Sequence, residues 1–179
     1  MAEAQDRRHL AHLDVRQVDA PALWLLRVFR PTPENVSELA ATLDVAVAER
    51  AGFWVGGASP NLRIGPGEWI FRDALPEALS EAREKLKLHS LTPLGAAMSA
   101  WRIDATHAPA LLASGTEVDL HPRAFLAGAG VKTLFARIPV LISNRGANGF
   151  ELLHDSAWLA YVSEWLAEAR RSFDIAESA

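Results

Sequence analysis

The residues able to carry chemistry are scattered along this chain rather than grouped at catalytic spacing. The sequence lacks cysteine, which excludes disulfides, thiolate metal sites and cysteine nucleophiles. Among the six histidines, His9 and His12 stand three residues apart, where they share one helix face, but no carboxylate lies at ligand spacing beside them. We therefore interpret these two histidines as solvated residues and predict no metal site.

Two glycine-containing segments match phosphate-binding loops only in part. In the segment 128–133, Val131 separates the glycines from Lys132, so backbone amides and ammonium do not converge on one phosphate. The segment Gly65-Pro66-Gly67 lacks the third glycine of a dinucleotide-binding loop. Both segments lead into predicted strands, whereas such loops lead into helices. We therefore predict no nucleotide site in either segment.

The carboxylates and tryptophans offer the remaining candidates. Asp104 and Asp119 are the carboxylates set in apolar surroundings, and we favour an outward-facing strand position for Asp104 over a cavity position. The tryptophans have the flat faces that stack a ligand such as a pterin, although core and interface positions are more common for this residue. They are Trp24, Trp54, Trp69, Trp101, Trp158 and Trp165. The residues alone thus indicate a well-formed fold with no catalytic constellation.

Composition and charge narrow the class of protein. The chain has 179 residues, of which 22% are charged, and a net charge of −4, so it has no electrostatic footprint for nucleic acid. Charges in the first sixteen residues exclude a signal peptide there, and no apolar run has the length of a membrane span. We predict a cytoplasmic protein with neither nucleic-acid nor membrane partners.

The first half of the sequence reads as strand, helix, two strands and helix. Residues 1–20 are polar and predict a loose lead-in. The apolar segment 22–30 lies between two prolines and predicts a buried strand. Thr32 and Pro33 form an N-cap and a first helical position, and the helix is expected to end near Gly52. Short strands at 62–64 and 68–71 follow around the turn 65–67, and Pro76 opens a second helix.

The second half repeats this order of elements. A strand is predicted at 97–105 and a short helix at 109–113. A long β-like run, 131–143, is interrupted by Pro139, which should mark an edge or a bend. Asn148-Gly149 then predicts a hairpin because this pair supplies positive φ angles. A strand follows at 150–153, and Asp155 or Ser156 caps the last helix.

This order predicts an α+β fold with pseudo-duplication, although no sequence repeat is visible. We expect a single domain over residues 21–179, made of two halves at about 21–90 and 91–179. Each half contributes a strand-helix-strand-helix unit.

Two blocks carry a family resemblance. The segment 62–70 resembles the Gly-Pro-x-Glu-Trp-Leu block of sarcosine oxidase gamma subunits and related folate-binding proteins. The segment 118–133 is similar to their Asp-Leu-x-Pro-x-x-Phe block and the Gly and Thr that follow. Order and spacing agree over 25–173. The matching positions are Gly65, Pro66, Glu68, Trp69, Asp119, Leu120, Pro122, Phe125, Gly128 and Thr133.

The resemblance implies a folate-binding-domain-like, pseudo-duplicated α/β sandwich in which these ten residues have scaffold roles. Gly65 and the glycine at 67 would permit a tight turn that delivers Trp69 into a sheet, and Asp119 would cap a turn anchored by Phe125. The sequence departs from the family at 106–109, at 94–97 and before the last helix. A divergent member with a changed partner surface is therefore implied.

The resemblance also implies a function. Heterotetrameric sarcosine oxidases demethylate sarcosine to glycine, reduce oxygen to hydrogen peroxide and pass the one-carbon unit to tetrahydrofolate. Their FAD, FMN, NAD and folate sites lie on the large subunits, and the gamma subunit has no recognised active site. This chain is thus expected to bind no cofactor of its own and to dock on the large flavin- and folate-binding subunits. The resemblance does not identify the amine substrate.

Two other readings remain open from the sequence. In one, the chain binds tetrahydrofolate by itself and transfers one-carbon units like an aminomethyltransferase, with Asp104 or Glu151 as the acidic residue. In the other, it is a folate-fold assembly or repair factor, although such proteins usually carry a cysteine motif that is missing here. A docking subunit would expose apolar surface, and isolated chains would self-associate through it. The expected contributors are Trp24, Phe53, Trp54 and Leu126.

Overall fold

The computed structural model describes residues 14–29, 31–44, 46–57, 60–73, 84, 89–104, 106–147 and 149–177. The chain divides into two compact units, one formed by Ala20–Ala96 and the other by Met1–Asp19 with Ala97–Ala179. Each unit contains one antiparallel sheet and at least one helix, so the fold is mixed α/β with two antiparallel sheets.

The unit Ala20–Ala96 is built on a four-stranded sheet in the order β3-β4-β2-β5. Its central strand β2 is antiparallel to both β4 and β5, and it confirms the strand predicted between the two prolines. The elements are β2 (Leu23–Val28), α2 (Pro33–Leu43), β3 (Asn61–Gly65), β4 (Glu68–Arg72) and β5 (His89–Pro93). The helix predicted from Pro76 lies outside the described residues except for Glu84, which is helical.

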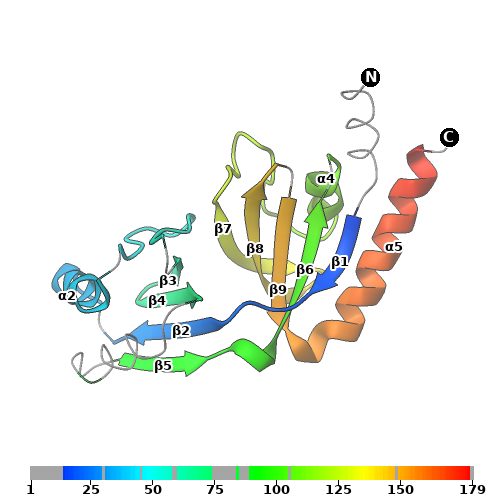
Figure 1. Ribbon diagram of the computed structural model, residues 1–179. Coiled ribbons are helices and arrows are strands. Elements are labelled where there is room, and N and C mark those ends of the chain that lie inside the picture. The colour runs from blue at the N-terminus through cyan, green and yellow to red at the C-terminus, as the bar shows by residue number, and fades with distance from the viewer. Residues whose placement is uncertain are drawn as a thin grey trace. The chain divides into compact units, whose positions relative to one another are not determined.

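Helix α2 covers one face of this sheet (Figure 1). Its start is as predicted, because the Thr32 hydroxyl oxygen accepts a hydrogen bond from the Asn35 amide at 3.3 Å and Pro33 occupies the first turn. Its predicted end near Gly52 is wrong. The helix stops at Leu43 because Asp44 adopts a left-handed conformation, with φ +51°, which cannot continue the helix.

The second unit is built on a five-stranded sheet in the order β1-β6-β9-β8-β7. Its strands are β1 (Asp14–Val18), β6 (Met98–Asp104), β7 (Gly130–Phe135), β8 (Ile138–Gly146) and β9 (Gly149–Asp155). Its helices are α4 (Ala108–Ala113), η2 (Ser156–Trp158) and α5 (Leu159–Glu177), and the short helix η1 (Gly95–Ala97) precedes β6. The predicted strand, short helix, hairpin and final helix of this half are all confirmed.

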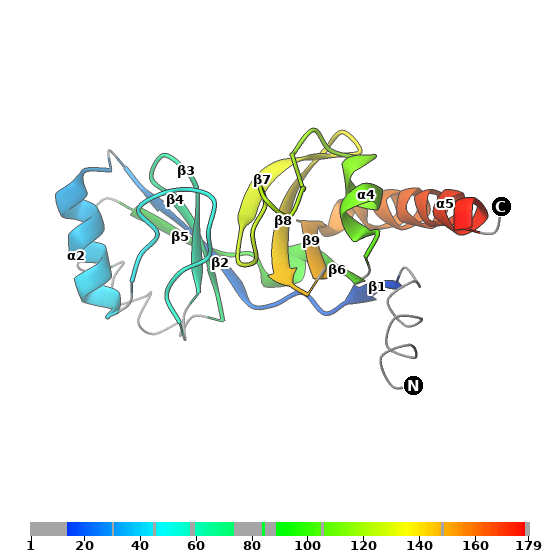
Figure 2. The ribbon, with the colours of Figure 1, turned by 90° about the horizontal axis from the view of Figure 1, so that it is seen from above.

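Helices α4 and α5 lie against the same face of the five-stranded sheet (Figures 1 and 2). Alternate strand residues point into this layer because successive side chains of a strand face opposite ways. The core that results includes Ile103, Leu111, Leu112, Phe135, Ile142, Phe150, Leu152, Val162 and Leu166. Within the described part of the chain, no helix has the length and apolar character needed to span a membrane.

The expectation of a loose lead-in is wrong for Asp14–Val18, which form β1. This strand pairs antiparallel with β6 from Asp14 opposite Asp104 to Val18 opposite Ala100. Val15 also packs against the apolar core of the second unit. Pairing with a strand more than eighty residues away is what orders this polar segment, and local sequence patterns carry no sign of it.

The edge or bend that we expected at Pro139 is not found there. The chain turns at Ala136 and Arg137, and Pro139 lies inside β8, opposite Leu134 of β7. In a hairpin with a two-residue turn, Phe135 and Ile138 form the hydrogen-bonded pair, so the next pair does not need the missing proline N–H. Pairing of β8 with β9 begins only at Val140, so the proline costs no ladder bond on that side either.

The predicted hairpin between β8 and β9 is present. In its described residues the positive φ angles fall on Gly146, at +79°, and Ala147, at +47°, rather than on Gly149. Asn148 lies outside the described residues. Asp155 then caps the following helical turn, because its Oδ1 accepts a hydrogen bond from the Ala157 amide at 2.8 Å.

Candidate functional site

The first motif block forms the β3–β4 hairpin. Gly67 has a φ of +68°, and a Cβ atom placed on it would lie 2.5 Å from the Val28 carbonyl oxygen. This position therefore requires glycine both for its conformation and for its close approach to the backbone. Trp69, two residues later, is fully buried, and its indole N–H donates to the Ala48 carbonyl at 2.8 Å.

Charged residues of this block pair within their own unit. Glu68 accepts a hydrogen bond from Arg27 Nε at 2.8 Å, which joins β4 to β2. Arg63 lies over the Trp69 ring, 5.4 Å from its centroid. Gly65 sits at a register shift in β3, and Pro66 is exposed in the turn. These contacts hold the hairpin in place.

The second motif block is an exposed loop with two buried anchors. Leu120 and Phe125 are 3% and 6% exposed, and the Phe125 ring is parallel to that of Phe150 at a centroid distance of 6.3 Å. Asp119 Oδ1 accepts from the His121 amide at 2.9 Å, which forms a local turn, while Pro122 is exposed.

The end of this block is fixed by a residue that sequence reasoning missed. The side chain of Asn144 on β8 donates through Nδ2 to the Phe125 carbonyl at 2.6 Å, and the backbone carbonyl of Asn144 accepts from the Gly128 amide at 2.8 Å. Gly128 itself has a φ of +83°, and Thr133 is half-buried on β7 opposite Val140. Nothing in the sequence marks Asn144, because its partners come from a loop sixteen to nineteen residues earlier.

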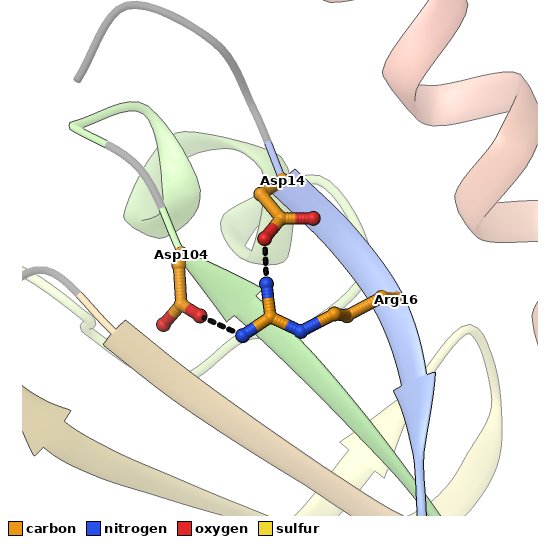
Figure 3. A network of polar contacts seen from close by, with 3 residues as sticks. All are labelled: Asp14, Arg16 and Asp104. Atoms are coloured by element: carbon orange, nitrogen blue, oxygen red, sulfur yellow. Dashed lines mark hydrogen bonds and ion pairs between the residues drawn. The ribbon is translucent and has the colours of Figure 1, made fainter. Parts of the chain in front are cut away.

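The first acidic candidate, Asp104, lies at the end of β6 and is engaged by an arginine of β1. Figure 3 shows Arg16 between Asp14 and Asp104, and its Nη2 lies 3.1 Å from Asp104 Oδ2. The other guanidinium nitrogen contacts Asp14. Asp104 is half-buried, so the prediction of a plain outward-facing residue missed its partner on β1.

The second acidic candidate, Glu151, is 4% exposed on β9 and lies 3.4 Å from Arg145 Nη1. Strand register places Arg16, Arg102, Glu151 and Ser143 in one row across four neighbouring strands, on the face opposite the helices. Within this row Arg102 Nε is buried without a hydrogen-bond partner among the described residues. Each acidic candidate therefore already has a guanidinium partner, which leaves neither as an isolated carboxylate.

Most of the tryptophans serve the two cores. Trp69 and Trp101 are buried, Trp165 meets Phe135 edge to face at a centroid distance of 4.6 Å, and Trp24 packs against the core of its unit. Trp54 is half-buried with Arg72 over its ring, at 5.0 Å from the centroid. Trp158 differs from these residues, because its side chain is 44% exposed.

The residues expected to form an apolar docking face do not share one environment. Phe53 and Leu126 are 45% and 49% exposed and belong to different units, whereas Trp24 and Trp54 are half-buried. His9 and His12 lie outside the described residues, and His107 and His121 are exposed.

A histidine that the sequence analysis did not single out is buried in the second unit. His154 on β9 is 1% exposed, and its Nε2 lies 3.1 Å from the Trp101 indole nitrogen. The alternation of β9 would have revealed it, since His154 follows Phe150 and Leu152 on the core-facing side.

The comparisons with known proteins agree over most of the chain. A sarcosine oxidase gamma subunit from an Arthrobacter species is 30% identical over 150 residues, which cover 80% of this chain and 73% of that protein. A chain of the heterotetrameric sarcosine oxidase from Corynebacterium sp. U-96 matches 92% of this chain and 86% of its own length. Its TM-score is 0.80 and its sequence identity 24%, so it shows the shared fold.

A second solved structure, with a lower TM-score, is that of an enzyme. The glycine cleavage system aminomethyltransferase T from Bartonella henselae matches 90% of this chain but 47% of its own length, with a TM-score of 0.56 and 14% identity. This likeness also shows the fold alone. No protein-family model matches the sequence.

Proposed function

This chain belongs to the family of sarcosine oxidase gamma subunits, and from that premise we propose that it is the non-catalytic gamma subunit of a heterotetrameric sarcosine oxidase. The observation that carries the proposal is the extent of the match. An alignment of 150 residues is longer than either structural unit, so it spans both rather than one shared motif.

In this proposal the chemistry takes place on the large subunits, which bind FAD, FMN, NAD and tetrahydrofolate. A flavin bound to the large subunits would accept the hydride from sarcosine, and oxygen would be reduced to hydrogen peroxide. The oxidised one-carbon unit passes to tetrahydrofolate and glycine leaves. The complex is cytoplasmic, in keeping with a chain free of cysteine.

The geometry of the two acidic candidates supports a scaffold role for this chain. One-carbon chemistry on folate needs a carboxylate that is available to the ligand, whereas Asp104 and Glu151 are engaged by Arg16 and Arg145. The ten motif residues act in this proposal as scaffold, which fits the buried anchors Trp69, Leu120 and Phe125. The stand-alone folate-binding reading is therefore not favoured.

We also infer that the two halves are structural repeats. The sheet orders β5-β2-β4-β3 and β1-β6-β9-β8 correspond strand for strand, with a helix after β2 and after β6. Ala51 and Val55 form isolated bridges with β3. These bridges correspond to the pairing of β7 with β8 in the other unit. The two units exchange the strand that precedes them in the sequence. Strand β1 precedes β2 but pairs with β6, and β5 precedes β6 but pairs with β2. An experimental structure in which β2-α2-β4 fails to superpose on β6-α4-β9 would refute this inference.

The function is tested by purifying the tagged chain from its native cell. We expect identified flavin-containing large subunits in the eluate, flavin absorbance, and hydrogen peroxide production that depends on sarcosine. A dimethylglycine assay in parallel reports on the amine preference. Recovery of a colourless single chain whose melting temperature rises with tetrahydrofolate would overturn the proposal in favour of a folate-binding protein.

A further inference from the structure

Strand β7 is one of the two edges of the five-stranded sheet, and its outward backbone groups can be identified. With a two-residue turn at Ala136 and Arg137, Phe135 and Ile138 form a hydrogen-bonded pair, and pairs alternate from there along the hairpin. Leu134 therefore faces Pro139 in a pair that is not hydrogen-bonded, as the missing proline N–H requires. The N–H and C=O groups of Leu134 and Lys132 consequently point away from β8.

No described residue receives these outward groups. The sheet order ends at β7, and the hydrogen bonds of the loop that runs beside the hairpin engage Ala136, whose N–H donates to the Gly115 carbonyl at 2.7 Å. The Leu134 side chain is 57% exposed. A strand edge with open donors and acceptors and an exposed leucine is a template for pairing with another chain.

A cavity lies beside this part of the edge. Its volume is about 410 Å³, and it is lined by Thr133, Leu134 and Arg137 together with residues 113–117. Gly115 lets the loop approach, because a Cβ atom there would lie 2.6 Å from the Phe135 ring. The rim carries charges of both signs, from Glu117 and Arg137.

The hairpin is also braced from the helix side. Ala136 and Arg137 have φ angles of +48° and +70°, which side chains other than glycine rarely adopt. The Tyr161 hydroxyl on α5 donates to the Ala136 carbonyl at 2.9 Å and holds the turn in this conformation. A rigid edge loses little entropy on pairing, which favours association.

We propose that β7 is the docking edge of this subunit, and that an extended segment of a large subunit of the oxidase adds to it as a further strand. The occupant pairs its main chain with Lys132 and Leu134 and places one side chain in the cavity beside Thr133. A segment with charged residues flanking that side chain complements Glu117 and Arg137. Strand β7 exposes one charged residue, Lys132, whereas the opposite edge, β1, exposes two, Asp14 and Arg16, and is therefore less suited to strand addition.

The proposal rests on the proposed function, and two variants of one residue separate main-chain pairing from side-chain contact. Leu134→Pro removes an N–H group that points away from β8 and is not bonded to it. An edge strand tolerates proline at such a position. Leu134→Ala keeps the N–H and shortens the side chain. We expect Leu134→Pro to recover at least about tenfold less flavin-containing subunit than the unchanged chain, and Leu134→Ala to recover more than Leu134→Pro. The melting temperature of each isolated variant verifies that it folds.

Hydrogen exchange on the unchanged complex gives an independent readout. The amides of Lys132 and Leu134 should exchange more slowly in the complex than in the isolated chain, whereas Thr133, bonded to β8, should be protected in both. Equal exchange in both states, with full recovery by Leu134→Pro, would overturn the docking edge and leave the proposed function intact. If the isolated chain forms a dimer that Leu134→Pro dissociates, the occupant of the edge is a second copy of this chain. That result would also overturn the proposal. Failure of the unchanged chain to recover any large subunit would instead count against the proposed function.

Discussion

The indole N–H of Trp101 donates to Nε2 of His154 across 3.1 Å inside the second unit. Both side chains are buried, and an indole nitrogen is a donor only, so Nε2 of His154 must be the acceptor. The proton of the neutral ring then sits on Nδ1, 2.8 Å from the Asp155 carbonyl oxygen. One hydrogen-bond chain thus joins β6 to the end of β9, next to the cap of the last helix.

Replacing His154 by phenylalanine should destabilise the protein by about 1–3 kcal/mol, because the Trp101 N–H remains buried without an acceptor. Urea unfolding followed by circular dichroism measures the change in the free energy of unfolding. The double variant with Trp101→Phe should cost less than the sum of the two single changes, since the first change already breaks the bond. Strictly additive costs would show that the two residues are not coupled.

Three glycines allow conformational strain to be separated from steric conflict. Gly67→Ala should destabilise by more than about 2 kcal/mol, because the new Cβ atom meets the Val28 carbonyl at 2.5 Å in a residue with φ of +68°. Gly128→Ala should cost about 1–2 kcal/mol, since its φ is +83° but nothing lies within 4 Å. Gly95→Ala, which has neither feature, is the matched control. Thermal unfolding of the three variants gives the order, and an equal effect at Gly67 and Gly95 would contradict it.

The two arginine–carboxylate contacts should differ in strength because their burial differs. Arg145→Ala leaves the Glu151 side chain, 5% exposed, without this ion partner and should cost about 1–3 kcal/mol. Arg16→Ala should cost about 0–1 kcal/mol, because Arg16 and Asp14 are each 50% exposed and Asp104 is 35% exposed. Chemical denaturation in low and high salt compares them. A larger cost for Arg16→Ala would refute this assignment.

Glu34 links the stability of α2 to pH. Hydrogen bonds from its own backbone N–H and from the Thr32 side chain lower the pKa of the Glu34 carboxyl below the usual 4.5. A lowered folded-state pKa stabilises the protein fully above the unfolded value, and this contribution is lost as pH falls through the folded value. Glu34→Gln should therefore lower the melting temperature at neutral pH and have less effect as the pH falls below 4.5 and through the folded-state pKa. Glu38→Gln, in the same helix, is the control. A difference that grows as pH falls would contradict the prediction.

Local sequence patterns determined much of this fold. Thr32 with Pro33, the glycines of the 65–67 turn and the Asp155 cap each act through neighbours within a few residues, so their effect is visible in the sequence. Alternation and apolar runs likewise gave the strands β2, β6 and β9. The family was also visible there, because motif blocks depend on residue identity and order.

Only the tertiary structure decided which distant segments meet. The polar segment Asp14–Val18 becomes a strand because β6 offers it hydrogen bonds and Arg16 meets Asp104, eighty-eight residues away. The position of Pro139 inside β8 depends on which partner strand needs its N–H. The partners of Glu151, Asn144 and His154 likewise come from other strands and loops. Such pairings are set by sheet register and by the packing of the whole core, and no local propensity encodes them.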